Sequence, residues 1–131
     1  MNQCIFVFEF ITGGGLASAP LPPSLAREGA LMRDALLRDA LDLPDTTVLT
    51  LHDTRLDLPA HPQVERIPVT ESAGFDAALD AALTRADAVL VVAPETGGVL
   101  AALAARVEAA GRPLLGCDSA TSALAASKSR T

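Results

Sequence analysis

Residues 4–10 read CIFVFEF, an apolar run that a single acid, Glu9, interrupts near its end. A strand with one face in water alternates apolar and polar residues, whereas this run offers apolar side chains to both faces. We therefore expect residues 4–10 to form a central strand with helices packed on both sides of its sheet.

Further strands are expected at intervals along the chain. The aliphatic and β-branched segments 46–51 and 88–93 favour buried strands. Residues 64–69 indicate a weaker strand, and Pro68 within it places that strand at a sheet edge, because proline cannot donate to a neighbouring strand. A short last strand is predicted at residues 113–115.

Helices are expected between these strands. One is predicted from Ser24 to about residue 41, and its buried stripe is read as Leu25, Gly29, Met32, Leu36 and Ala40. Others are predicted after Ser72, between Thr96 and Gly111, and over residues 118–127, with the Ser and Thr residues as helix caps. The alternation predicts an α/β fold, a single three-layer domain over residues 1–131 with a mostly parallel sheet of about five strands.

Charge and composition exclude several classes of protein. The chain carries 10 basic and 16 acidic residues, a net charge of −6, which predicts no nucleic-acid partner and no anionic membrane partner. No apolar run approaches the roughly 20 residues of a membrane span. The start lacks the positive flank of a signal peptide, and Cys4 and Cys117 match no metal or redox spacing. These features predict a reduced, cytoplasmic protein.

Three consecutive glycines, Gly13 to Gly15, follow the first strand. Ligands of open α/β sheets gather beyond the carboxyl ends of the strands, which is where this loop should lie. The spacing matches neither the dinucleotide fingerprint nor the P-loop. Two readings remain open: a mobile loop that uses unusual φ values, or a cover over a substrate or a neighbouring domain.

Two acids also fall at strand ends, Glu9 after the first strand and Glu95 after the strand at 88–93. Glu9 either accepts hydrogen bonds from loop amides or pairs with the ammonium group of a substrate. Glu95 either complements the helix dipole beside Thr96 or faces the same ligand. Two acids at one sheet edge favour a pocket for a cation or an amine.

No complete catalytic set is visible in the chain. His52 and His61 are expected to be exposed loop residues, because no metal-ligand spacing relates them. Cys117 is read as a small buried residue rather than a reactive thiol, since no basic residue adjoins it. Ser119 is read as a helix cap. The sequence therefore supplies no catalytic residue and no metal ligand.

Four segments, in this order, resemble a known family. They are FEFITGGG (8–15), Pro22 with SLAREGALM (24–32), VVAPET (91–96) and GRPLLGCDS (111–119). Together they resemble the N-terminal, Rossmann-like pre-ATP-grasp domain of ATP-grasp ligases, in the branch of the tyramine–glutamate ligases of methanofuran biosynthesis. The resemblance covers essentially the whole chain.

The resemblance implies a function that these residues do not perform alone. Such ligases join a carboxylate to an amine through an acyl phosphate, and their ATP and Mg²⁺ are bound mainly by a following ATP-grasp domain. The chain would then be one domain of a longer ligase, not catalytic by itself and with no cofactor of its own, and its partners would be the rest of that ligase and the two substrates. Glu28 would lie on the first turn of its helix, and the substrate-binding residues would be Glu9, Gly13, Gly14, Gly15, Glu28, Glu95 and Thr96.

Two other readings of the chain stay open. It is either a ligase domain or a complete, flavodoxin-like module that binds a small molecule or regulates another protein. A homodimer is a further alternative, in which the alanines of the third helix pack against a second copy. Ordinary packing of that helix on the sheet is the preferred explanation for the same residues, Ala101, Ala102, Ala105 and Ala109.

Overall fold

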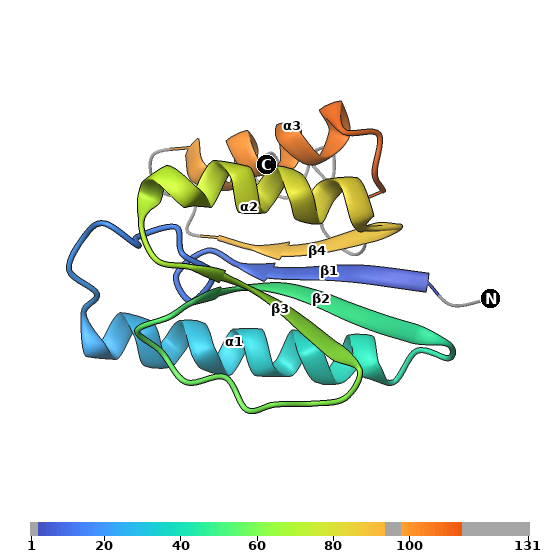
Figure 1. The fold of residues 1–131 in the computed structure, drawn as a ribbon, viewed down its shortest axis with the longest axis horizontal. Helices are drawn as coiled ribbons and strands as arrows, with labels where there is room; N and C mark the ends of the chain where they lie inside the picture. Colours follow the sequence, from blue (N-terminus) through green and yellow to red (C-terminus); the bar gives the residue numbers. More distant parts are fainter. Residues whose placement is uncertain (1–2, 94–97, 114–131) are drawn as a thin grey trace, which may run out of the picture.

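The first predicted strand lies inside a parallel sheet. A computed structural model describes residues 3–93 and 98–113 (Figure 1). Its strands are β1 (Gln3–Glu9), β2 (Thr46–Asp53), β3 (Val64–Val69) and β4 (Ala88–Val92), in the spatial order β3-β2-β1-β4. Every neighbouring pair is parallel. The α/β fold and the edge position of the strand that contains Pro68 are thus confirmed.

Helices cover both faces of this sheet. The helix α1 (Pro23–Leu41) lies on one face, and α2 (Ser72–Arg85) and α3 (Val99–Ala109) lie on the other (Figure 1). Alternate side chains of β1 enter the two layers: Ile5 and Val7 pack with the α1 core, whereas Phe6 and Phe8 pack with the core under α2 and α3. All four are buried. The central, doubly covered strand predicted from the sequence is confirmed.

The four phenylalanines of the chain form one cluster. Phe8 lies at its centre, with ring centroids 5.7 Å from Phe6, 6.4 Å from Phe10 and 5.8 Å from Phe75. Phe10 and Phe75 meet edge to face at 6.1 Å. The aromatic packing therefore holds the end of β1 against α2, next to the carboxyl edge of the sheet.

The strand count differs slightly from the expectation of about five. The described residues contain four strands, and most of the predicted strand at 113–115 lies outside them. The Val89 amide of β4 donates to the carbonyl of Pro113 at 2.9 Å, so the chain lies beside β4 at Pro113. The helix predicted over 118–127 lies outside the described residues.

The predicted helix caps are wrong where the structure shows them. The helix α1 begins at Pro23, before Ser24, and α2 begins at Ser72 itself with Glu71 as its N-cap. The third helix begins at Val99 after Gly98, at φ 72°, rather than at Thr96. None of the three starts has a side-chain cap. At α1 the reason is Pro23, whose fixed φ suits a first helical turn and which has no N–H that would need an acceptor.

The buried stripe of α1 is shifted by one residue from the predicted one. Gly29 and Ala40 are buried as expected, but Met32 is 45% exposed and Arg33 is buried in its place. Apolar residues occupy neighbouring positions, such as Leu36 and Leu37, but the buried stripe is the less apolar of the two, because it includes Arg33 where the predicted one has Met32. Helical periodicity alone therefore placed the buried face one residue away from its observed position. The structure buries Ala26, Gly29, Arg33, Leu37 and Ala40.

Four of the alanines of α3 are exposed rather than buried as the sequence predicted. Leu103, Ala104 and Val107 pack on the sheet, and helix-on-sheet packing therefore accounts for these three residues. The alanines that this packing was expected to bury are instead exposed on the other side of the helix: Ala101, Ala102, Ala105 and Ala109.

Candidate functional site

A pocket of about 250 Å³ lies between α1 and the carboxyl ends of β1 and β4. Glu9 and Val92 end two neighbouring strands and stand side by side in the sheet register, which brings both strand ends to this place. Residues from the first half of α1 form the opposite wall. The lining consists of Glu9, Ile11, Leu25, Glu28, Gly29, Met32, Val92 and Ala93.

Glu9 is the buried polar group of this pocket, only 2% exposed. One carboxylate oxygen, Oε1, accepts a hydrogen bond from the Thr12 amide at 2.7 Å, and the other, Oε2, accepts from the Ile11 amide at 3.1 Å. The reading of Glu9 as a carboxylate bound by loop amides is thus confirmed. Among the residues that the structure describes, no ion pair involves Glu9, so its charge has no cationic partner there.

Gly29 lets α1 approach this carboxylate closely. A Cβ atom at position 29 would lie 2.5 Å from Glu9 Oε1 and 3.2 Å from the Cβ of Ile11. Because Glu9 is held by two amides, it could not simply move aside. The lack of a side chain at position 29 therefore allows α1 to lie this close to Glu9.

Glu28 lines the same pocket as Glu9. It lies more than one turn into α1, not on the first turn, because the helix starts at Pro23. Glu28 is exposed and Glu9 is buried, while Leu25, Met32 and Ile11 supply apolar walls. Two carboxylates in a mainly apolar pocket favour a small ligand that has a cationic group and an apolar body.

The glycine loop is packed against the core. Cβ atoms at Gly13, Gly14 and Gly15 would lie 2.5 Å from Phe8 Cε1, 2.5 Å from Val69 Cγ1 and 2.4 Å from Phe10 Cε1. The amides of Gly13 and Gly15 already donate to the carbonyls of Glu9 and Phe10, at 2.8 and 2.9 Å. Gly14 alone of the three has a positive φ, 94°. The close approach that requires these glycines is therefore to the protein's own side chains.

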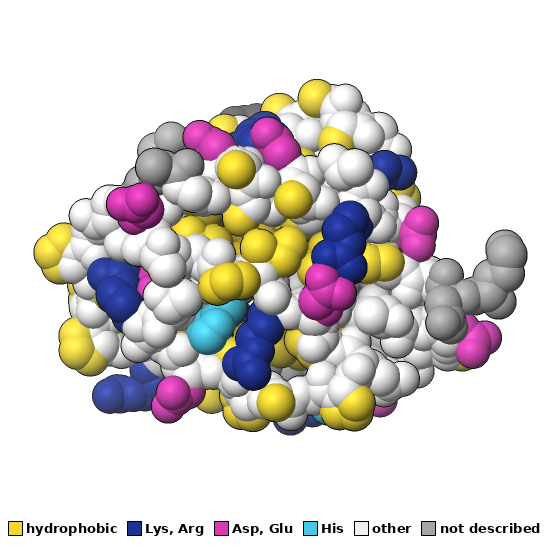
Figure 2. Space-filling model, viewed as in Figure 1, with side chains coloured by type: hydrophobic (Ala, Val, Ile, Leu, Met, Phe, Trp, Pro, Cys, Tyr) yellow, Lys and Arg dark blue, Asp and Glu magenta, His cyan; other side chains and the backbone are white. Residues whose placement is uncertain are grey.

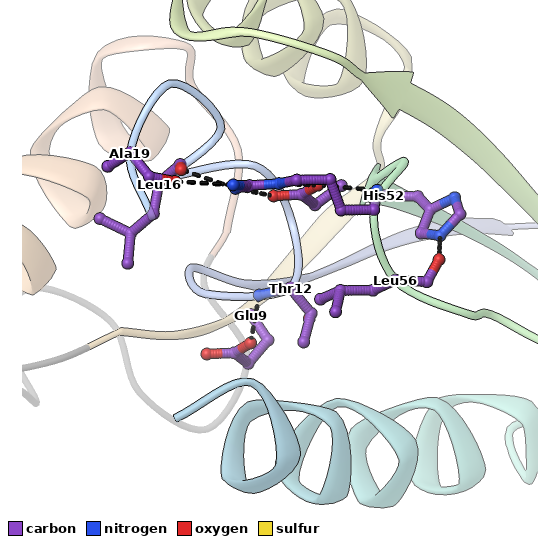
Figure 3. Close-up of polar contacts among 8 residues, drawn as sticks. Glu9, Thr12, Leu16, Ala19, His52 and Leu56 are labelled. Atoms are coloured by element: carbon purple, nitrogen blue, oxygen red, sulfur yellow. Dashed lines mark hydrogen bonds and ion pairs between the residues drawn. The ribbon is translucent and has the colours of Figure 1, made fainter. Parts of the chain in front are cut away.

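An ion pair at the end of β2 holds the same loop from the other side. Asp53, 1% exposed, accepts hydrogen bonds from Arg55 Nε at 3.0 Å and Nη2 at 2.7 Å. The guanidinium also donates to the carbonyls of Ala19 at 2.6 Å and Leu16 at 2.7 Å (Figure 3). The Asp53 amide donates to the Thr12 carbonyl at 2.8 Å. The loop is thus tied to β2 at three of its carbonyl groups.

The Asp53–Arg55 pair makes stability depend on pH. Burial alone would raise the pKa of Asp53, but the hydrogen bonds and charge of Arg55 outweigh it and hold that pKa below its ordinary value. The hydrogen bond to Asp53 raises the pKa of Arg55 in turn. A depressed carboxyl pKa stabilises the fold above the unfolded-state pKa, about 3.9, and this contribution is lost as the pH falls through the folded-state value.

We expect the free energy of unfolding of Asp53→Asn to fall less than that of the wild type as the pH is lowered. Urea unfolding of the wild type should show a steeper fall in the free energy of unfolding between about pH 5 and pH 3 than unfolding of the variant. Arg55→Met leaves Asp53 buried without its cation, and burial then raises the pKa of that carboxyl. The contribution of Asp53 should therefore change sign, so that it favours the folded state as the pH falls. A variant profile parallel to that of the wild type would show that the pair does not set the acid dependence.

The histidines do not form a metal site. His61 is exposed, as predicted, whereas His52 lies in β2, half-buried, and its Nε2 donates to the Leu56 carbonyl at 2.6 Å (Figure 3). Within residues 3–93 and 98–113, no group of three His, Cys, Asp or Glu side chains could hold a metal ion. On the face shown in Figure 2, basic and acidic side chains are interspersed rather than gathered into one basic patch.

Part of the predicted site lies outside the described residues. This holds for Glu95, Thr96, Cys117 and Ser119. The structure adds two groups that the sequence did not single out, Arg55 beside Asp53 and the buried Arg33. The signal for Arg55 was available, because an Asp-x-Arg sequence follows a strand whose end must reach the same sheet edge.

The fold and its edge pocket define an α/β domain of the doubly covered parallel type, with a candidate ligand site at the carboxyl ends of the strands. The sequence profile of the pre ATP-grasp 3 domain matches residues 46–121. That match spans more than half of the chain, and the chain belongs to this family.

A solved structure has a similar fold. It is a crystal structure of a protein from Archaeoglobus fulgidus that is assigned to the ATP-grasp superfamily, with a TM-score of 0.62 and 21% sequence identity. The similarity covers 90% of this chain but 34% of that protein, so the chain spans about a third of the length of its structural relative.

Two further findings complete the comparisons. No curated protein matches the chain. In the part of the chain that the structure describes, no helix has both the length and the apolar character needed to cross a lipid bilayer.

Proposed function

We propose that this domain forms the substrate-side wall of an ATP-dependent carboxylate–amine ligase of the ATP-grasp type. The observation that carries the proposal is the pocket in which buried Glu9 and exposed Glu28 face apolar side chains, within a domain of the pre ATP-grasp 3 family. In such a ligase, ATP and Mg²⁺ activate the carboxylate as an acyl phosphate, and the amine then attacks it.

In this proposal the pocket receives the amine substrate. The ammonium group would lie against Glu9, whose oxygens keep lone pairs beyond those used by the amides of Ile11 and Thr12. The walls formed by Leu25 and Met32 would cover the apolar body of the amine and exclude water. The family resemblance makes tyramine the first amine to test and glutamate the first carboxylate, as in a methanofuran-type biosynthetic pathway.

ATP and Mg²⁺ are assigned to residues other than those of this pocket. The described residues offer no metal-ligand group, and the amides of Gly13 and Gly15 are engaged within their own loop. The amides of Gly13 and Gly15 are therefore not free to bind a nucleotide phosphate. The proposal assigns the domain a role in holding one substrate.

The test uses the complete product of the open reading frame that encodes these 131 residues. ADP release should require ATP, Mg²⁺, an amine and a carboxylate together, with tyramine and glutamate tried first, and mass spectrometry should detect the amide product. The 131-residue chain alone should release no ADP. A reading frame that closes after Thr131, together with tight binding of a small molecule by the chain alone, would instead support the flavodoxin-like binding module.

A further inference from the structure

The loop of residues 10–22 connects the two walls of the Glu9 pocket. It leaves β1 directly after Glu9, and Ile11 near its start lines the pocket. It ends where α1 begins, and Leu25 and Gly29 line the pocket from that helix. The course of this loop between its ends therefore influences the spacing of Ile11 and Leu25 across the pocket.

Arg55 donates hydrogen bonds to the middle of this loop from outside the pocket. Its Nη1 and Nη2 atoms donate to Ala19 and Leu16, which are three residues apart in the loop, while Asp53 orients the guanidinium plane. Figure 3 shows Leu16 and Ala19 together on one side of the view, whereas Thr12 and Glu9 lie nearer to α1. Arg55 is 39% exposed, so its bonds hold the loop at the surface rather than filling the core.

The arrangement of acceptors around residue 55 suits an arginine and not a lysine. A planar guanidinium can donate to one carboxylate and two carbonyls at once in fixed directions, whereas an ammonium group is a single point of charge. We propose that Arg55 is a positioning residue that sets the width of the Glu9 pocket by fixing the loop at Leu16 and Ala19. The inference rests on the proposed function only in taking the occupant of the pocket to be an amine.

Amide hydrogen exchange measures the loop directly. Ala17 and Ala19 donate within the loop, to the carbonyls of Gly14 at 3.1 Å and Leu16 at 3.0 Å, so their exchange rates report its opening. In Arg55→Met both should exchange about tenfold faster, because loss of the bonds to the guanidinium favours local opening. Arg55→Lys should fall between this variant and the wild type.

Arg112 supplies a matched control at a distant place. Its guanidinium also donates to two carbonyls, those of Leu83 and Thr84, both at 2.9 Å. Arg112→Met should leave the exchange of Ala17 and Ala19 unchanged. The Phe10 amide, which donates to Val92 at 2.9 Å, serves as an internal reference, since faster exchange there would report opening of the sheet rather than of the loop alone.

The pocket is tested in the same variants. Methyl NMR signals of Ile11, Leu25 and Met32 should shift in Arg55→Met and not in Arg112→Met, and the affinity for hexylamine should fall about tenfold although Glu9 and Glu28 are intact. Unchanged exchange and unchanged methyl signals in Arg55→Met would overturn the inference. If the wild type binds no hexylamine, the amine role of the pocket fails, while exchange and methyl signals still decide the role of Arg55.

Discussion

Replacement of Glu9 by alanine is expected to lower the free energy of unfolding by about 2–5 kcal/mol. The carboxylate accepts from the amides of Ile11 and Thr12, and it is 2% exposed. Removing it leaves two backbone donors without their partner in a region that water reaches poorly. Urea unfolding monitored by far-UV circular dichroism measures the loss.

Glu9→Gln removes the charge of the side chain and keeps its shape. One of its two terminal atoms must be an NH₂ group, which would face a backbone donor wherever it is placed, because Oε1 and Oε2 each accept from an amide. We expect a loss of about 1–3 kcal/mol in stability, together with loss of amine binding. Glu28→Gln removes the same charge from the rim of the same pocket and, as a surface change, should alter stability by less than about 0.5 kcal/mol.

These variants distinguish a structural carboxylate from one that also binds a ligand. If hexylamine binds Glu9→Gln as tightly as it binds the wild type, under conditions where the variant is folded, Glu9 serves the loop alone. A weaker affinity in Glu28→Gln, with stability unchanged, would show that the charge of the pocket attracts the amine independently of the loop.

Replacement of Gly14 by alanine is expected to lower the free energy of unfolding by about 2–4 kcal/mol. Two effects add at this residue. Its φ of 94° is strained for any residue with a side chain, and the new Cβ would lie 2.5 Å from Cγ1 and 2.6 Å from Cβ of Val69. Val69 is 1% exposed at the end of β3, so it has little room to move.

The control variant Gly111→Ala separates backbone strain from the clash with a neighbouring side chain. The φ of Gly111 is 74°, and a Cβ there would meet nothing within 4 Å, so Gly111→Ala adds backbone strain without a clash. We expect this control to lose about 1–2 kcal/mol. Equal losses in the two variants would show that contact with Val69 contributes nothing and that the loop can shift away from the sheet.

The arrangement of the sheet was predictable from a few residues. The unbroken apolar run at 4–10 required cover on both faces, and the structure provides α1 on one side and α2 with α3 on the other. Pro68 required an edge, and β3 is at the edge. These features depend on local backbone chemistry and on which residues are apolar, and both are properties of short stretches of sequence.

The details of the site depend on contacts between distant segments. The glycines at 13–15 suggested either mobility or a cover over a ligand, but their neighbours are Phe8, Phe10 and Val69, whose closeness follows from tertiary packing. Whether Met32 or Arg33 is buried on α1 depends on which of two neighbouring faces of the helix packs against the sheet. The Arg55 bonds to Leu16 and Ala19 join residues 39 and 36 positions apart, which no local pattern encodes.

The aromatic cluster gives the protein an unusual optical property. With no Trp and no Tyr in the chain, and all four phenylalanines packed on the α2 and α3 side, near-UV circular dichroism reports the order of that side alone. The α1 side, including the Glu9 pocket, is silent in that spectrum. A phenolic amine bound there could therefore be excited at wavelengths where phenylalanine does not absorb, and its fluorescence anisotropy could be followed with no label attached.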